Sequence, residues 1–252
     1  MKTAIVTGAS AGLGREFVLA LGKYFPDIES YWLIARREDR MRELIDMLPG
    51  KDIKILSLDL LKHESFDKLG DMLASEQPDV RLLINTAGCG YLNNVGDGAL
   101  DEQLEMCDLN MRAVTAVTHL TIPYISDGGR IINISSISSF VPNSRLTVYS
   151  ATKSYITAFS RGIGDELRHR HVKVTVAFPG PMDTEFIYKG RIMGKSKPYD
   201  ILPFCNPRVI ANGALRTAKA GRRTYVHGIF YNYYNFAGKF FPHKYLVPLA
   251  RA

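Results

Sequence analysis

The sequence is poor in cysteine and has no acidic residue in its last 52 positions. Its three cysteines, Cys89, Cys107 and Cys205, are odd in number and far apart, which argues against a disulfide framework and against a zinc site. The histidines are also scattered. We therefore expect a reducing compartment and no bound metal.

Long hydrophobic runs are absent as well: none approaches the roughly 18 residues that a membrane-spanning helix needs. The apolar segment Ala4–Val6 begins almost at the first methionine and continues into a glycine-rich turn, so we expect no signal peptide and a cytoplasmic protein. Hydrophobic residues make up 46% of the chain, enough for a large core, and no linker or repeat divides it. We predict one domain over residues 1–252.

The net charge of +7 is unevenly distributed. Residues 1–200 contain 24 basic and 25 acidic residues, whereas residues 201–252 contain eight basic residues and no acidic one. Such a segment can bind a phosphate-bearing ligand, an anionic membrane or nucleic acid, or can simply be a solvated rim. No other feature indicates nucleic acid, so we expect no nucleic-acid partner.

Short apolar runs alternate with amphipathic helical patterns along the chain. Six runs have the length and composition of buried parallel strands: residues 2–6, 31–35, 53–58, 81–84, 130–134 and 172–177. Five segments have apolar residues at helical spacing: residues 13–24, 39–48, 66–73, 100–124 and 148–168. Repeated βα units predict an α/β fold in three layers, a doubly wound parallel sheet with helices on both faces.

A glycine-rich turn follows the first predicted strand. Gly8 permits a tight turn, Gly12 lets a ligand approach the main chain, and Gly14 lets the helix pack closely on the strand. The main-chain amides and the helix dipole favour a pyrophosphate here, although the pattern also fits an ordinary βα turn. The candidate cofactor-binding residues of this turn are Thr7, Gly8, Ser10, Ala11, Gly12, Leu13 and Gly14.

The residue after the second strand indicates which dinucleotide is bound. An NAD site would place an acidic residue there to accept hydrogen bonds from the ribose, but Ala35 is followed by Arg36 and Arg37. Two guanidinium groups suit a 2′-phosphate, so NADP(H) is favoured over NAD(H). Alternatively, Arg36 covers the adenine or points into solvent.

Three side chains can converge on one reacting atom. Ser136 follows the fifth strand, and thirteen residues later Tyr149 and Lys153 begin a helix one turn apart on one face. Reduction of a carbonyl by hydride needs a proton donor at the developing alkoxide, and a phenol beside an ammonium can provide it. Three other serines, Ser135, Ser138 and Ser139, lie close by, but the spacing selects Ser136 and leaves Ser135 as a strand-end hydrogen bonder.

These motifs together resemble the short-chain dehydrogenase/reductase family, in its single-domain branch of about 250 residues, over residues 1 to about 185. The resemblance implies a Rossmann-like sheet of order 3-2-1-4-5-6-7. It also implies that Asn110 completes the catalytic set with Ser136, Tyr149 and Lys153, and that Tyr149 and Lys153 contact the cofactor. The further cofactor-binding positions that it implies are Asp59, Leu60, Asn85, Ala87, Gly88, Pro179, Gly180 and Thr184. The family's second asparagine is replaced by Thr86, and Ala11 stands where NADP-preferring members often have a basic residue.

The C-terminal part is more individual. Residues 185–205 resemble the family's substrate-binding loop, and residues 225–252 form an aromatic, basic extension. One helical face of the extension would combine Phe230, Tyr233, Tyr234, Ala237, Phe240 and Phe241. A lid, a subunit interface and a membrane-bound amphipathic helix would each cover this face. We expect packing on the body or on a partner subunit in a dimeric or tetrameric homo-oligomer, with membrane contact less favoured.

Two functions are compatible with these features. The first is an NADPH-dependent oxidoreductase that interconverts a carbonyl and a secondary alcohol on a lipophilic small molecule, such as a ketoacyl or steroid-like compound. The second is a non-catalytic cofactor-binding protein that regulates a partner or contacts a membrane surface. The complete set of Asn110, Ser136, Tyr149 and Lys153 favours the enzyme, and Tyr91 is a candidate for substrate contact.

Overall fold

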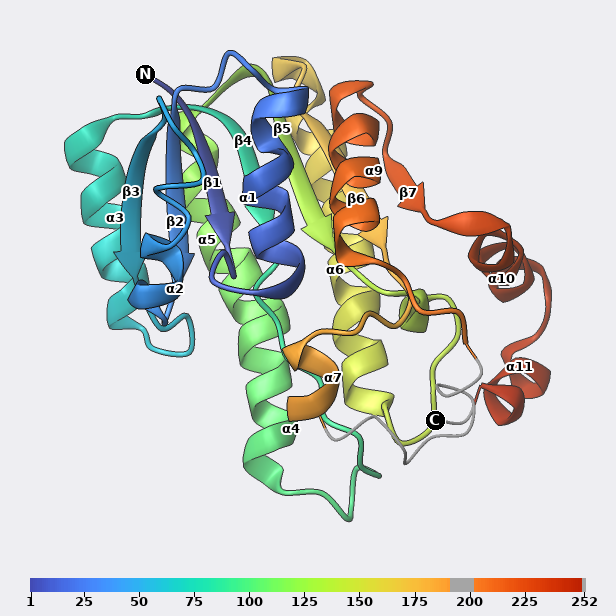
Figure 1. The fold of residues 1–252 in the computed structure, drawn as a ribbon. Helices are drawn as coiled ribbons and strands as arrows, with labels where there is room; N and C mark the ends of the chain where they lie inside the picture. Colours follow the sequence, from blue (N-terminus) through green and yellow to red (C-terminus); the bar gives the residue numbers. More distant parts are fainter. Residues whose placement is uncertain (191–201, 251–252) are drawn as a thin grey trace.

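The computed structural model describes residues 1–190 and 202–250. Its centre is a seven-stranded, entirely parallel sheet of order β3-β2-β1-β4-β5-β6-β7 (Figure 1), which confirms the predicted fold. The strands are β1 (Lys2–Thr7), β2 (Ser30–Ala35), β3 (Asp52–Ser57), β4 (Asp79–Asn85), β5 (Ile125–Ile134), β6 (Lys173–Phe178) and β7 (Thr224–Val226).

Helices cover both faces of the sheet (Figure 1). One core lies between the sheet and helices α1 and α9, around Phe17, Leu21 and Leu215. The other lies under α3, α5 and α6, around Leu69 and Val117. The helices are α1 (Gly12–Tyr24), α2 (Glu38–Arg42), α3 (Glu64–Glu76), α4 (Leu100–Cys107), α5 (Ala113–Thr121), α6 (Thr147–Glu166), α7 (Glu185–Lys189), α9 (Pro207–Lys219), α10 (Gly228–Phe240) and α11 (His243–Leu249).

The structure differs from the sequence-based prediction at several elements, and helix α9 was not among the predicted helices. The predicted helix over residues 39–48 ends at Arg42, because the hydrogen bonds that follow join residues three apart and form successive turns. The predicted helix over residues 100–124 is interrupted by a π-helix at Asp108–Arg112 and ends in a 3₁₀ turn at Ile122–Tyr124. Strand β7 was not identified, because three residues carry too little periodicity and this strand is defined by its pairing with β6.

The aromatic extension forms α10 and α11 at the β7 edge of the molecule (Figure 1). Of the six residues on the predicted apolar face, four are not covered by the described part of the chain: Phe230, Tyr233, Phe240 and Phe241. The face that packs on the body contains Tyr231 and Ala237, both buried, and Tyr234, which lies near the ring of Phe140. Within residues 1–190 and 202–250, no helix has the length and apolarity to cross a membrane.

Candidate active site

The glycine-rich turn joins β1 to α1 at the carboxyl edge of the sheet. Gly8 and Gly12 have positive φ angles of 70° and 49°. A Cβ at Gly14 would lie 2.1 Å from the main-chain oxygen of Gly8, so a larger residue cannot occupy this position. At the start of α1, Ala11 makes no capping hydrogen bond through its side chain, and the first turn contains no acidic residue. This helix N-terminus can therefore receive an anionic group.

Thr7 connects the turn to the segment after β4. Its hydroxyl oxygen accepts hydrogen bonds from the main-chain amides of Thr86 at 3.1 Å and Ala87 at 3.2 Å, and Thr86 donates its own hydroxyl to the Thr7 carbonyl. Thr86, which replaces the family's second asparagine, thus holds these two segments together. The buried side-chain amide of Asn85 instead donates hydrogen bonds to Thr118 on α5 and Asn133 on β5, so it holds the end of β4 to these two elements.

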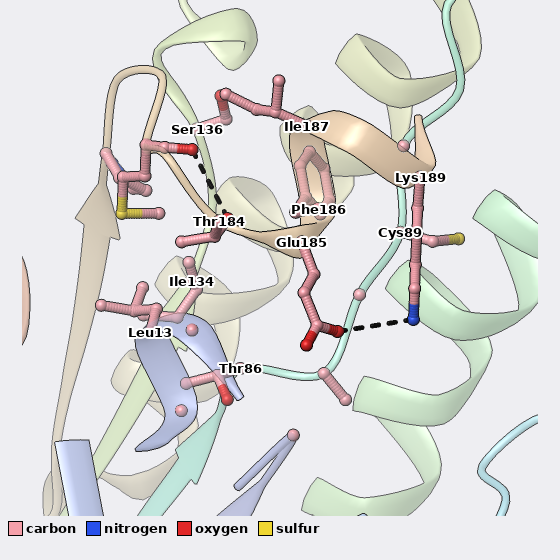
Figure 2. Close-up of a pocket in the computed structure, with 18 of the residues that line it drawn as sticks. Leu13, Thr86, Cys89, Ile134, Ser136, Thr184, Glu185, Phe186, Ile187 and Lys189 are labelled. Carbon is pink, nitrogen blue, oxygen red and sulfur yellow. Dashed lines mark hydrogen bonds and ion pairs between the residues drawn. The ribbon is translucent and has the colours of Figure 1, made fainter. Parts of the chain in front are cut away.

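Two arginines follow β2 and line one end of the cleft. Arg36 is exposed, whereas Arg37 forms an ion pair at 2.9 Å with Glu185 at the start of α7. The hydrogen bond from Arg37 lowers the pKa of Glu185. Glu185 also pairs with Lys189 at 3.6 Å on the same helix (Figure 2), so it connects Arg37 to the start of the predicted substrate loop.

Lys153 lies at the base of the cleft and is buried. Its ammonium donates to the main-chain oxygen of Ile134 at 3.0 Å and lies 5.6 Å from the centroid of the Tyr149 ring. Burial lowers the pKa of Lys153 from 10.5 to about 8. The buried Tyr149 ring packs beside Phe186, with the ring centroids 5.7 Å apart, and a Cβ at Gly90 would lie only 3.0 Å from it.

The two serines after β5 have different surroundings. The Ser136 hydroxyl oxygen accepts a hydrogen bond from the amide of Ser138 at 3.1 Å, which caps the 3₁₀ helix Ile137–Ser139, and Ser136 lines the cleft. Ser135 donates to the main-chain oxygen of Lys153 at 2.8 Å and lies 2.9 Å from the hydroxyl of Thr157. Ser135 therefore fastens the strand end to α6.

Asn110 lies in the middle of the π-helix and is completely buried. Its side-chain oxygen accepts from the amide of Cys89 at 2.9 Å, and its side-chain nitrogen donates to the Cys89 carbonyl at 2.9 Å and to Thr152 at 3.0 Å. A π-helical turn displaces side chains from the positions of a regular α-helix, which is common at functional sites. Asn110 thus joins the segment after β4 to α6 directly behind Lys153, whose ammonium lies 3.5 Å from a Cβ built at Gly88.

The cleft has a volume of about 270 Å³ and contains most of the predicted site residues. Those that line it are Gly8, Ser10, Ala11, Gly12, Leu13, Gly14, Arg36, Arg37, Ala87, Gly88, Ser136, Tyr149, Lys153, Pro179, Gly180 and Thr184. Those that do not line it are Thr7, Asp59, Leu60, Asn85 and Asn110. Asp59 accepts a hydrogen bond from the amide of Leu61 at 3.2 Å.

Several lining residues were not singled out from the sequence: Glu105, Leu109, Met182, Phe186, Ile187 and Lys189. Phe186 to Lys189 fall at the start of the predicted substrate loop, but residues 191–201 of that loop lie outside the described residues. Glu105 gave no sequence signal, because an acidic residue on a short helix is usually solvated. It accepts a hydrogen bond from the Tyr91 hydroxyl at 2.8 Å. Burial, together with this bond, raises the pKa of Tyr91, and burial raises the pKa of Cys89 to about 12, so its thiol is neutral.

Comparison with known proteins shows the family to which the chain belongs. A sequence model described as short chain dehydrogenase matches residues 2–191, and the chain belongs to that family. An uncharacterized oxidoreductase of Staphylococcus epidermidis is 31% identical over 185 residues, which cover 73% of this chain and 79% of that protein. An uncharacterized oxidoreductase of Staphylococcus aureus is 30% identical over 204 residues, covering 79% and 87%.

Solved structures share the fold over almost the whole chain. A short-chain dehydrogenase from Sphingobium yanoikuyae in complex with NADPH superimposes with a TM-score of 0.82 at 21% identity, covering 95% of this chain and 93% of that one. An alcohol dehydrogenase from the archaeon Thermococcus sibiricus, complexed with 5-hydroxy-NADP, gives a TM-score of 0.76 at 25% identity, covering 89% and 95%. The protein is therefore an oxidoreductase of a family whose members bind NAD(P).

Proposed function

We propose that the protein is an NADP(H)-dependent oxidoreductase that interconverts a carbonyl and a secondary alcohol on a lipophilic small molecule. The observation that carries this proposal is the position of the buried Lys153. Its ammonium donates a hydrogen bond to the Ile134 carbonyl and lies near the Tyr149 ring, and Lys153 lines the same cleft as the glycine-rich turn. Burial of an ammonium group costs free energy, so a lysine with a purely structural role is not expected at this position. A charged group buried in a cleft is instead typical of a functional site.

The residues that line the cleft fit a dinucleotide that carries a 2′-phosphate. The uncapped start of α1 would hold the pyrophosphate. The main chain at Gly12 is open, since among the described residues only Thr184 lies near a Cβ built there. Arg36 and Arg37 would bind the 2′-phosphate through charge-assisted hydrogen bonds. The 5-hydroxy-NADP complex of the Thermococcus sibiricus relative supports this preference. Bound NADP(H) supplies or accepts the hydride.

The chain's own side chains would manage the proton. Tyr149 would give its hydroxyl proton to the developing alkoxide during reduction and take it back during oxidation. The Ser136 oxygen already accepts a hydrogen bond from the Ser138 amide, so its own proton is available to a substrate oxygen. Lys153 would stabilise negative charge at the phenol, and Asn110 would keep α6 and the segment after β4 in register.

The apolar lining of the cleft supports an apolar substrate. Leu109, Met182, Phe186 and Ile187 line the cleft, and aromatic and aliphatic walls of this kind bind apolar molecules. We propose that the segment 185–205 is the substrate-binding loop of the single domain, with α7 as its first part.

The decisive experiment measures oxidation of NADPH with a graded set of ketones, from short aliphatic ketones to ketoacyl and steroid-like compounds. We expect turnover that rises with substrate apolarity and is faster with NADPH than with NADH. The Tyr149→Phe variant provides the blank. Turnover restricted to small polar carbonyls would contradict the proposed substrate class, and equal rates with the two cofactors would contradict the proposed cofactor.

A further inference from the structure

Helix α10 has a second apolar face that the described part of the chain does not cover. Ile229, Tyr233, Phe236 and Phe240 follow one another at intervals of four, three and four residues, which places them on one side of the helix. Their exposed fractions are 91%, 66%, 51% and 69%. We call these four residues the outer stripe. Tyr231 lies on the opposite side of the helix and is buried.

The exposed apolar surface continues onto α11. Tyr245 and Leu249 lie one turn apart on this helix and are exposed, as is Phe241 between the two helices. Of the 17 large hydrophobic residues that are exposed in the described chain, eight lie between residues 229 and 249. Scattered exposed hydrophobic residues are normal, but such a concentration on two consecutive helices indicates an interaction surface.

Cations border the outer stripe. Asn232, Asn235 and Lys239 occupy the neighbouring side of α10, and the two asparagines form a cleft with Arg216 and Arg222. On α11, the Lys244 ammonium lies 4.8 Å from the centroid of the Tyr245 ring. No acidic residue follows Asp200 in the sequence, so these cations have no counter-charge within their own segment.

The charge of this surface indicates whether a second copy of the chain or a lipid surface binds to it. A second copy docked on the same face would bring Lys239 and Lys244 towards identical cations without any carboxylate from the segment to pair with them. An anionic lipid surface supplies the missing negative charge and accepts apolar rings at the boundary between headgroups and acyl chains. Tyrosine side chains are also favoured at this depth.

We propose that α10 and α11 bind the surface of an anionic bilayer, with the outer stripe inserted at the acyl boundary and Lys239 and Lys244 at the headgroups. The side of α10 that packs on the body connects this proposed membrane-binding surface to the cleft. Tyr231 donates to the Pro203 carbonyl at 2.6 Å and leaves no space for a Cβ at Gly180, a residue that lines the cleft. The proposal concerns attachment alone and does not depend on the substrate.

The test is cosedimentation of the purified full chain with vesicles of phosphatidylcholine, with and without phosphatidylglycerol. Binding should require phosphatidylglycerol and should fall steeply as salt is added, because screening weakens charge attraction. The double variant Phe236→Ser/Phe240→Ser should weaken binding at least about tenfold through lost apolar insertion, and Lys239→Glu/Lys244→Glu should do the same through repulsion.

Matched controls use surfaces far from this extension in the sequence. Leu100→Ser/Leu104→Ser removes two exposed residues one turn apart on α4, and Lys62→Glu/Lys68→Glu reverses two exposed charges. Both should bind vesicles like the unmodified protein. The proposal is overturned if the unmodified protein ignores anionic vesicles at low salt, or if controls and test variants lose binding equally. It is also overturned if the stripe variants change only the molecular mass in solution, which would assign the surface to a second copy.

Discussion

The ammonium of Lys153 is held 3.0 Å from the carbonyl oxygen of Ile134 and 5.6 Å from the centroid of the Tyr149 ring. The main chain at the end of β5 thus fixes the position of a side chain that comes from α6. Ser135 strengthens the same junction, since its hydroxyl donates to the main-chain oxygen of Lys153. A cation fixed in this way can act on the phenol without reorganisation, which is the usual requirement of a preorganised site.

The Tyr149→Phe variant removes the proposed proton donor and leaves the glycine-rich turn and the two arginines unchanged. We expect kcat to fall about 10²- to 10⁴-fold with NADPH affinity almost unchanged. Steady-state kinetics and fluorescence titration with NADPH measure the two effects. Tyr155→Phe is the matched control, because Tyr155 lies on the same helix and, among the described residues, its hydroxyl bonds the Thr115 hydroxyl, at 2.7 Å. Near-normal turnover by Tyr149→Phe would remove this residue from the mechanism.

The buried charge of Lys153 predicts a pH-dependent stability. Its pKa is about 8 in the folded protein against 10.5 for the free side chain, so the unfolded chain holds this proton more tightly. The resulting cost to folding is fully present below pH 8 and disappears as the pH rises through 10.5. Without cofactor, Lys153→Met should raise the free energy of unfolding by up to about 3 kcal/mol at neutral pH.

Urea unfolding of both proteins across this range tests the prediction. The difference between variant and unmodified protein should shrink towards zero as the pH approaches 10.5. The prediction is contradicted if the difference in unfolding free energy does not change with pH, or if the variant is less stable than the unmodified protein at neutral pH. Either result would show that burial of the charged Lys153 does not lower the stability of the fold. Turnover by the same variant should be strongly reduced, because the group beside the phenol is lost.

Arg36→Asp tests the cofactor preference. The change removes the proposed ionic hydrogen bond to the 2′-phosphate and adds repulsion, so binding of NADPH should be weakened more than binding of NADH by about 2 to 4 kcal/mol. Dissociation constants for both cofactors provide the measurement. Arg40→Asp makes the same change on α2, at a residue that pairs with Glu43 and does not line the cleft. Equal affinity of the unmodified protein for both cofactors would contradict the assignment.

Glu185→Gln releases Arg37 from its ion pair. Because an exposed pair of this kind is worth about 0.2 to 1 kcal/mol, NADPH binding should tighten by a factor of about 1.4 to 5. NADH lacks the 2′-phosphate, so its affinity should not change. Glu43→Gln, which breaks the pair with Arg40 instead, is the control. Weaker NADPH binding by Glu185→Gln would indicate that the carboxylate itself orders the site.

Gly90→Ala should disturb Tyr149, the proposed proton donor, and leave the glycine-rich turn unchanged. Its Cβ would lie 2.7 Å from the Phe186 ring and 3.0 Å from the Tyr149 ring. Displacement of the phenol should lower kcat about 10- to 100-fold while NADPH affinity is retained. At Gly96 no atom of the described residues beyond its two chain neighbours lies within 4 Å of the added Cβ, so Gly96→Ala should leave kcat unchanged. An unaffected kcat in Gly90→Ala would show that α7 and Tyr149 tolerate the added carbon.

The sequence by itself determined the class of fold and most of the cleft. The glycine-rich turn, the alternation of strands and helices and the one-turn spacing of Tyr149 and Lys153 are local patterns, and local geometry translates them directly into structure. Parallel strands then bring their carboxyl ends to one edge, which gathers Gly12, Ser136 and Thr184 although they are distant in sequence.

Only the tertiary structure decided the features that depend on packing between distant segments. Arg37 pairs with Glu185, 148 residues away, and no periodicity connects them. Asn110 is oriented by a π-helix that a regular helical pattern does not reveal. On α10 both sides are aromatic, so periodicity could not identify the buried one. Contact with Gly180 selected Tyr231 and left the outer stripe exposed.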